Sequence, residues 1–308
     1  MSKKISLIFG AAGQDGSLMT RYLLKKNYNV YALSQSKNNS LIDIKKKDNL
    51  KILKINYYNF SQIKKIIIKS KCSEIYFFSG KSSPQFSFLN YHETLNSHII
   101  PVYNILQNIN EINKKIKFFN TSSSEIFEKS KKKLNEKSDK NPQNPYGLAK
   151  LDSLLLVKFY RKNFKLNCFS GILFNHESNL RPKYFFISKI INYIKKKKFN
   201  DKLKLGDLSV IKDFGWAEDY IEIIHQLVIR RKYEDYIIAT GKSYKLKNVV
   251  KKIFEFYDLN WKKYVVTDKK LSRPSENKII YANITKIEKL NLKPKKNLPY
   301  IIKELCKN

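Results

Sequence analysis

The chain has 308 residues, of which 42% are hydrophobic, enough for one large domain or two closely joined ones, and no apolar run approaches the ~18 residues of a membrane span. Its three cysteines, Cys72, Cys168 and Cys306, are too widely spaced for a disulfide framework or a zinc cluster, so we expect a cytoplasmic protein with no metal site. Because no apolar run is long enough to span a membrane, we also expect no membrane partner. The net charge of +35 comes from 61 basic residues, of which only six are arginines. Arginine binds phosphates and bases better than lysine does, so its scarcity favours a solvated lysine surface and no nucleic-acid partner.

Short apolar runs alternate with amphipathic stretches through residues 1–174. Near-continuous apolar strands separated by helices are typical of a parallel sheet covered on both faces. The predicted strands lie at 5–10, 29–34, 50–55, 74–79, 116–121 and 166–174, and the predicted helices between them at 15–26, 61–70, 92–110 and 145–163. We therefore expect an α/β fold, a Rossmann-type doubly wound parallel sheet, in residues 1–174, with later segments returning to it.

The pattern loosens in residues 175–308. Helices are predicted at 184–197, 218–231 and 245–257, with short strands between them, and the final "LPYIIKELCKN" predicts a closing helix. We expect this part to be a smaller C-terminal α/β region that mainly binds substrate.

Three glycines follow the first predicted strand and open the first predicted helix. Gly10, Gly13 and Gly16 stand in "IFGAAGQDGS" with the spacing G-x-x-G-x-x-G. Such a turn lets the backbone approach a pyrophosphate and aims a helix N-terminus at its charge. Because three of only nine glycines fall within seven residues at the place where the fold needs them, we interpret the turn as a dinucleotide site.

The second predicted strand ends in "SQSK", Ser34 to Lys37, and the first acid after it is Asp43. Proteins that bind NAD usually carry an acid at this point for the ribose 2′-hydroxyl. Hydroxyls and a lysine suit a 2′-phosphate better. We therefore predict NADP as the cofactor, with NAD as the second candidate.

A glutamate follows three serines directly after the fifth predicted strand, in "TSSSEIF" at 121–127. The carboxyl end of a parallel strand is where sites form in such sheets, although a solvated loop carboxylate is the alternative for Glu125. Tyr146 and Lys150 lie one helical turn apart in "NPYGLAK", after Pro145 at a predicted helix start. This spacing alone carries no weight, because Tyr22 and Lys26 share it.

Six segments in order resemble the GDP-mannose 4,6-dehydratase family of extended short-chain dehydrogenases/reductases, within the NAD-dependent epimerase/dehydratase superfamily. They are "GAAGQDGS", "TSSSEIF", "PYGLAK", "GILFNHES" (171–178), "LGDLSVIKDFGWAEDY" (205–220) and "RPSE" (273–276). The resemblance implies oxidation at C4 of a nucleotide-diphosphate hexose, loss of water across C5 and C6, and return of the hydride to C6. It also implies a homo-oligomer, a dimer or a tetramer.

The resemblance assigns roles to individual residues. It implies that Tyr146 takes the C4 hydroxyl proton beside Lys150, that Glu125 is the base at C5, and that Ser123, with Ser122 and Ser124 as alternatives, bonds the C4 oxygen. The implied cofactor contacts are Gly10, Gly13, Gln14, Asp15, Gly16, Ser34, Lys37, Asn56, Tyr57, Ser79, Ser82, Lys150, His176 and Arg181. The implied substrate contacts are Asn175, Lys189, Lys212, Arg273 and Glu276.

The chain departs from the family pattern at several of these places. Gln35 and Ser36 replace paired arginines, Lys212 replaces an arginine, and Asp207 replaces an asparagine. A nucleotide-sugar 4-reductase or 4-epimerase of the same superfamily therefore stays open as an alternative. A basic nucleic-acid-binding protein that keeps the fold without catalysis is the more remote one.

Overall fold

The computed structural model describes residues 3–36, 39–128, 130, 132–196, 199, 201–230, 232–271 and 281–307. The chain divides into two compact units. The larger unit consists of Met1–Ile126, Lys140–Leu173 and Ile221–Tyr236, and the smaller unit of Phe127–Asp139, Phe174–Tyr220 and Ile237–Asn308. Three residues with predicted roles, Lys37, Arg273 and Glu276, lie outside the described residues.

The larger unit contains a sheet of seven strands in the order β10-β6-β5-β4-β1-β2-β3. The pairs from β6 to β3 are parallel throughout, and Ile8 of β1 stands in register between Ala32 and Tyr76. The chain order reverses at β1, which is the switch point of a doubly wound fold and the place where ligands bind in such sheets. The strands are β1 Ile5–Phe9, β2 Asn29–Ser34, β3 Leu50–Lys54, β4 Glu74–Phe77, β5 Lys117–Ser123, β6 Cys168–Leu173 and β10 Tyr236–Ile238.

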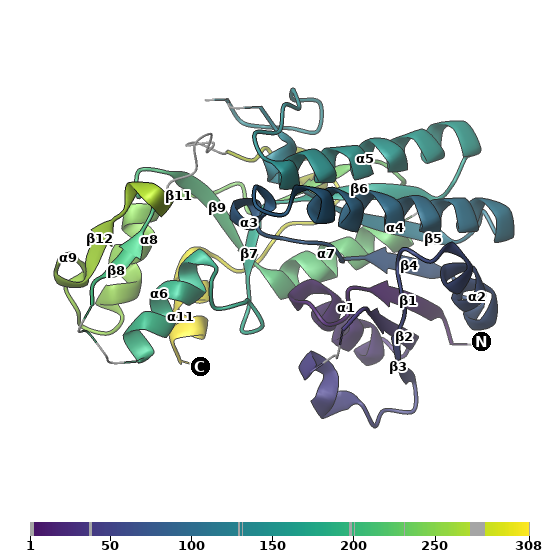
Figure 1. The fold of residues 1–308 in the computed structure, drawn as a ribbon, viewed down its shortest axis with the longest axis horizontal. Helices are drawn as coiled ribbons and strands as arrows, with labels where there is room; N and C mark the ends of the chain where they lie inside the picture. Colours follow the sequence, from purple (N-terminus) through teal and green to yellow (C-terminus); the bar gives the residue numbers. More distant parts are fainter. Residues whose placement is uncertain are drawn as a thin grey trace. The chain divides into compact units, whose positions relative to one another are not determined.

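Helices lie on both sides of this sheet (Figure 1). On one side α4 and α5 lie next to each other, and their apolar side chains pack with those of α2 against buried strand residues such as Phe77 and Phe118. The fold predicted from the sequence, a Rossmann-type parallel sheet, is confirmed. The helices are α1 Gln14–Lys25, α2 Phe60–Ser70, α3 Pro84–Ser87, α4 Tyr91–Ile112, α5 Pro145–Phe164 and α7 Ala217–Ile229, with 3-10 turns at η1 Asn39–Ile44 and η2 Ser124–Ile126.

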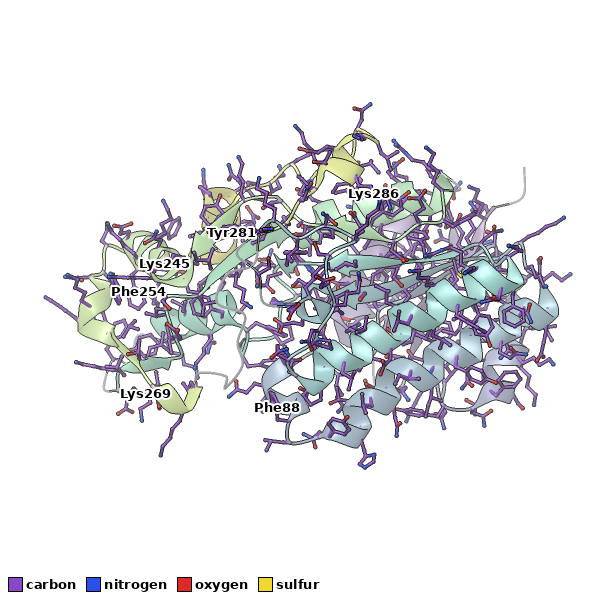
Figure 2. The ribbon with its side chains drawn as sticks, turned by 90° about the horizontal axis from the view of Figure 1, so that it is seen from above. Phe88, Lys245, Phe254, Lys269, Tyr281 and Lys286 are labelled. Atoms are coloured by element: carbon purple, nitrogen blue, oxygen red, sulfur yellow. The ribbon has the colours of Figure 1, made fainter. Side chains whose placement is uncertain are left out.

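The smaller unit has its own core. Ile187, Ile190, Ile191 and Ile194 recur at helical spacing on α6 and meet the apolar faces of α8 and α11. Phe254 of α8, labelled in Figure 2, is fully buried in this core. The elements are β7 Asn175–Glu177, α6 Phe186–Lys195, β8 Leu203–Leu205, β9 Ile211–Trp216, β11 Ser243–Lys245, α8 Leu246–Glu255, α9 Trp261–Tyr264, β12 Val265–Thr267, η3 Lys269–Leu271, α10 Thr285–Glu288 and α11 Leu298–Lys307.

Two small sheets complete this unit. In the first, β9 runs antiparallel to β11 and parallel to β7, and the second pairs β12 with β8 in parallel. Among the described residues, no helix is both long and apolar enough to cross a membrane.

Candidate active site

The glycine turn between β1 and α1 is closed so tightly that side chains are excluded from it. Gly10 has φ +83°, in the left-handed region, and a Cβ atom there would lie 2.7 Å from the backbone N of Ser79. A Cβ atom on Gly16 would lie 2.3 Å from the carbonyl oxygen of Gly10. The first turn of α1 therefore packs directly on the loop, and the N-terminus of this helix is aimed at the place where a phosphate would lie in such a turn.

The Tyr57 side chain forms hydrogen bonds with the backbone around this turn. Its buried hydroxyl donates to the carbonyl of Leu33 at 2.6 Å and accepts from the N–H of Gly10 at 3.0 Å. Burial raises the pKa of this phenol, so it stays a donor. The structure thus places Tyr57 as a support of the turn.

A cavity of about 360 Å³ lies where β2 and β3 end, lined by Gln35, Lys54, Ile55, Asn56 and Gln62. Asn56 N–H donates to Oε1 of Gln62 at 2.9 Å, which fixes one wall. Ser34 is buried and donates to the carbonyl of Ser36 at 2.6 Å. The sequence did not point to Lys54, because a lysine on a third strand carries no motif.

The three serines at the end of β5 differ in what their hydroxyls do. The Ser122 hydroxyl donates to the carbonyl of Lys150 at 3.2 Å and so faces α5. The Ser123 hydroxyl accepts from the N–H of Glu125 at 3.3 Å, which leaves its proton available to a ligand. Of these two, Ser123 is the one whose bonding suits substrate contact.

Glu125 is half-buried and tied to the start of α5. Asn144 Nδ2 donates to Glu125 Oε2 at 2.9 Å, while Asn144 Oδ1 caps the helix by accepting from the N–H of Gly147 at 2.8 Å. A Cβ atom on Gly147 would lie 2.4 Å from the backbone carbonyl of Glu125, so the two segments touch. Asn144 was missed from the sequence, although an asparagine before a proline at a helix start is a capping signal.

The Asn144 side chain therefore allows a test. Asn144→Asp keeps an oxygen that can cap α5 but replaces the donor to Glu125 with a second negative charge. We expect the melting temperature to change little and turnover to fall about tenfold, because the displaced carboxylate loses its position. Thermal unfolding and steady-state rates measured together check this. A melting temperature that falls along with the turnover rate would contradict it.

Tyr146 and Lys150 lie on one face of α5, as predicted. Lys150 is 4% exposed, and its Nζ atom donates to the carbonyl of Thr121 at 2.8 Å and lies 5.8 Å from the Tyr146 ring centroid. Burial lowers the pKa of Lys150 to about 7, against the opposing effect of the Asp15 carboxylate. An ammonium so poorly solvated is well suited to stabilise a nearby phenolate.

The remaining predicted cofactor residues of the larger unit lie at the start of α1 and in the loop after β4. Gln14 Nε2 donates to Asp15 Oδ1 at 3.0 Å at the start of α1. The backbone of Ser79 lies against Gly10, as its distance to the hypothetical Cβ atom shows. Ser82 is exposed in the same loop after β4.

The smaller unit carries its own set of predicted residues on β7, α6 and β9. Asn175 and His176 belong to β7, and the His176 ring lies 4.9 Å from that of Tyr220 and bonds the carbonyl of Phe174 through Nδ1 at 2.7 Å. The Arg181 guanidinium stacks on the Phe185 ring at 3.6 Å.

The two predicted substrate lysines of this unit, Lys189 and Lys212, are each at least partly buried. Lys189 Nζ donates to the carbonyl of Lys204 at 2.9 Å, and burial lowers the pKa of Lys189. Lys212 is buried on β9. Asp207 turns its Oδ1 atom to the N–H of Ser209 at 2.8 Å, so this carboxylate is used in its own loop.

Comparison with known proteins decides the family. The sequence profile of the family described as GDP-mannose 4,6 dehydratase matches residues 7–305. The chain belongs to the GDP-mannose 4,6-dehydratase family. GDP-mannose 4,6 dehydratase 1 of Arabidopsis thaliana is 30% identical over 98% of this chain and 88% of its own length. The human GDP-mannose 4,6 dehydratase is 29% identical over 98% of this chain and 90% of its own length.

Solved structures share the fold of this GDP-mannose 4,6-dehydratase family member. A dTDP-glucose 4,6-dehydratase from Bacillus anthracis, in complex with NAD, has a TM-score of 0.88 at 17% identity and covers 99% of this chain and 96% of its own. A UDP-glucose 4-epimerase from Thermotoga maritima, with UDP-glucose, has a TM-score of 0.86 at 17% identity, covering 98% and 97%. At this identity the likeness speaks for the fold alone.

Proposed function

We propose that this chain is a GDP-mannose 4,6-dehydratase that converts GDP-mannose into GDP-4-keto-6-deoxymannose and water. One observation carries the proposal: Glu125, Tyr146 and Lys150 are gathered around the first turns of α5, at the carboxyl end of the sheet. A carboxylate, a phenol and a cation in this arrangement provide the two bases that such an elimination needs.

The C5 proton of a hexose is not acidic, but it becomes so when C4 is a ketone. We assign Tyr146 to remove the C4 hydroxyl proton, with Lys150 stabilising the phenolate. Ser123 bonds the C4 oxygen. Glu125 then takes the C5 proton and gives a proton to the hydroxyl that leaves C6 as water. A nicotinamide cofactor held at the glycine turn would supply the hydride acceptor for C4 and the hydride donor for C6, so that the reaction would have no net redox change.

The larger unit fits such a cofactor. Gly10 and Gly16 pack against neighbouring backbone with no room for a Cβ atom, which gives the tight turn and close helix packing of a pyrophosphate-binding loop, and Gly13 stands between them where the backbone can approach the pyrophosphate. We assign Gly13, Gln14, Asp15, Ser79 and Ser82 to the same cofactor. In the smaller unit we assign His176 and Arg181 to the cofactor and Asn175, Lys189 and Lys212 to the nucleotide sugar, whose diphosphate suits basic groups.

We further propose that NADP is preferred over NAD. The described residues that line the cavity at the ends of β2 and β3 include Lys54 and no carboxylate, which suits a 2′-phosphate. Lys54→Glu is expected to weaken NADP binding about tenfold or more and NAD binding much less. Fluorescence titration with both cofactors measures this, and Lys51→Glu, an exposed change earlier on β3, is the matched control. Equal effects on both cofactors would contradict the preference.

The substrate assignment is tested with the purified protein. Incubation with a panel of nucleotide hexoses should give a 4-keto product lighter by one water from GDP-mannose, without consumption of added NADPH. A 4-reductase would consume NADPH stoichiometrically, and a 4-epimerase would give a product of unchanged mass. Either result would replace the proposal.

We also propose a cytoplasmic homo-oligomer. Tyr103 on α4 and Leu155 and Phe159 on α5 are 46%, 48% and 53% exposed on neighbouring helices, an apolar surface that a second copy of this chain could cover. Leu155→Glu together with Phe159→Lys should lower the molar mass measured by light scattering to that of one chain. An unchanged mass would place the contact elsewhere.

A further inference from the structure

His98 is a buried histidine near Tyr146 and Lys150 that the proposed mechanism does not use. His98 on α4 is 1% exposed, and its Nε2 atom lies 3.0 Å from the carbonyl oxygen of Lys81. Because a carbonyl only accepts, Nε2 carries the proton. Burial, reinforced by the charge of Lys150, holds the pKa of His98 well below its ordinary value, so the ring is neutral and Nδ1 keeps a lone pair.

The chain makes room for this ring. Gly80, which follows β4, has φ +116°, and a Cβ atom there would lie 2.1 Å from Cε1 and 2.4 Å from Nδ1 of His98. Only glycine fits both the backbone conformation and the space. Nδ1 is buried and has no hydrogen-bond partner among the residues that the structure describes. A buried acceptor without a donor is costly, which suggests a role beyond packing.

Two proposed catalytic groups lie beside this ring. The His98 and Tyr146 rings pack edge to face, with centroids 5.7 Å apart and planes at 70°. Lys150 is near enough that its charge is the second cause of the lowered pKa of the imidazole. Among the described residues, the charged and titratable groups around Lys150 thus include His98 from α4, Tyr146 from its own helix and Asp15 from α1.

We propose that His98 is a positioning residue for the catalytic pair: its ring packs against the Tyr146 phenol and orients it, and the lone pair of Nδ1 stabilises the charged form of Lys150. This inference rests on the proposed function only for its kinetic effects. In a site where burial disfavours the ammonium, a neutral acceptor supplies partial negative charge without pairing off the cation. A protonated imidazole would do the opposite, which is why the neutral form matters.

Two variants separate the ring from its nitrogens. His98→Phe keeps an aromatic ring against Tyr146 but removes the lone pair, and His98→Gln keeps a donor and an acceptor but removes the ring. The pKa of Lys150 is measured without turnover, by trace acetylation across pH with quantification of the Lys150 peptide by mass spectrometry. We expect this pKa to fall in His98→Phe and to stay near its wild-type value in His98→Gln.

Kinetics give the second readout. In His98→Phe we expect kcat to fall about tenfold with little change in KM, and the alkaline limb of the pH profile, where Lys150 loses its proton, to move to lower pH. His92→Phe, an exposed change on the same helix, is the matched control and should leave both quantities unchanged.

The outcomes are distinguishable. A folded His98→Phe protein with the wild-type pKa of Lys150 overturns the inference. If His98→Phe does not fold, a lowered pKa of Lys150 in His98→Gln overturns it and an unchanged one supports it. If the wild-type protein turns over no nucleotide hexose while His98→Phe still lowers the pKa of Lys150, the proposed function fails and the inference stands.

Discussion

Glu125→Gln is expected to reduce the dehydration of GDP-mannose about a thousandfold, because an amide cannot take the C5 proton. The fold should be kept, since the amide oxygen of the new side chain can still accept the hydrogen bond from Asn144 Nδ2. Oxidation at C4 does not need this base, so a single turnover should still reduce the bound cofactor, visible as absorbance near 340 nm.

The control for this change is Glu128→Gln, an exposed glutamate three residues later, which should keep full activity. Full dehydratase activity in Glu125→Gln would show that another group removes the C5 proton. Retained epimerisation with no loss of water in either protein would instead favour the 4-epimerase alternative.

Lys150→Met is expected to lower turnover about a thousandfold and at the same time to stabilise the fold. A buried lysine whose pKa falls from 10.5 to about 7 disfavours folding by roughly 4–5 kcal/mol wherever both states are charged, that is below pH 7. This cost disappears as the pH rises from about 7 to 10.5, because the folded state releases its proton first. Part of the gain in the variant is offset, since the Thr121 carbonyl loses its donor.

Thermal unfolding at pH 7 and pH 9 tests the second half of this prediction. The melting temperature of Lys150→Met should exceed that of the wild type at pH 7, and the gap should narrow at pH 9. Lys158→Met, at an exposed position of the same helix, should show no such dependence on pH. A gap that widens with pH would mean that Lys150 is charged and well paired in the folded protein.

The sequence was sufficient to predict the sheet and to name the candidate residues Glu125 and Tyr146, because both depend on local patterns. Six predicted strands correspond to β1 to β6, and Glu125 and Tyr146 follow from their places after a strand and at a helix start. β10 was missed because three residues, Tyr236–Ile238, are too few for a periodicity.

What the sequence could not provide depends on contacts between distant segments. His98 reads as one more residue of an amphipathic helix until its ring is seen against Tyr146 and Gly80. Tyr57 likewise matches a cofactor position, a role that stays a prediction, and only the structure shows that its hydroxyl bonds Leu33 and Gly10. The roles of Lys37, Arg273 and Glu276 stay predictions, because these residues lie outside the described part of the chain.

The path of the chain through its two units constrains how the protein is made. It passes from one unit to the other after Ile126, Asp139, Leu173, Tyr220 and Tyr236, so the larger unit is complete only when its last segment, Ile221–Tyr236, has been synthesised. On the ribosome, the nascent sheet must therefore wait for β10 and most of α7 after two of the three segments of the smaller unit, Phe127–Asp139 and Phe174–Tyr220, have been synthesised. A fragment released at residue 174 would lack an edge strand and a covering helix, and would be a substrate for chaperones and proteases rather than an independent nucleotide-binding module.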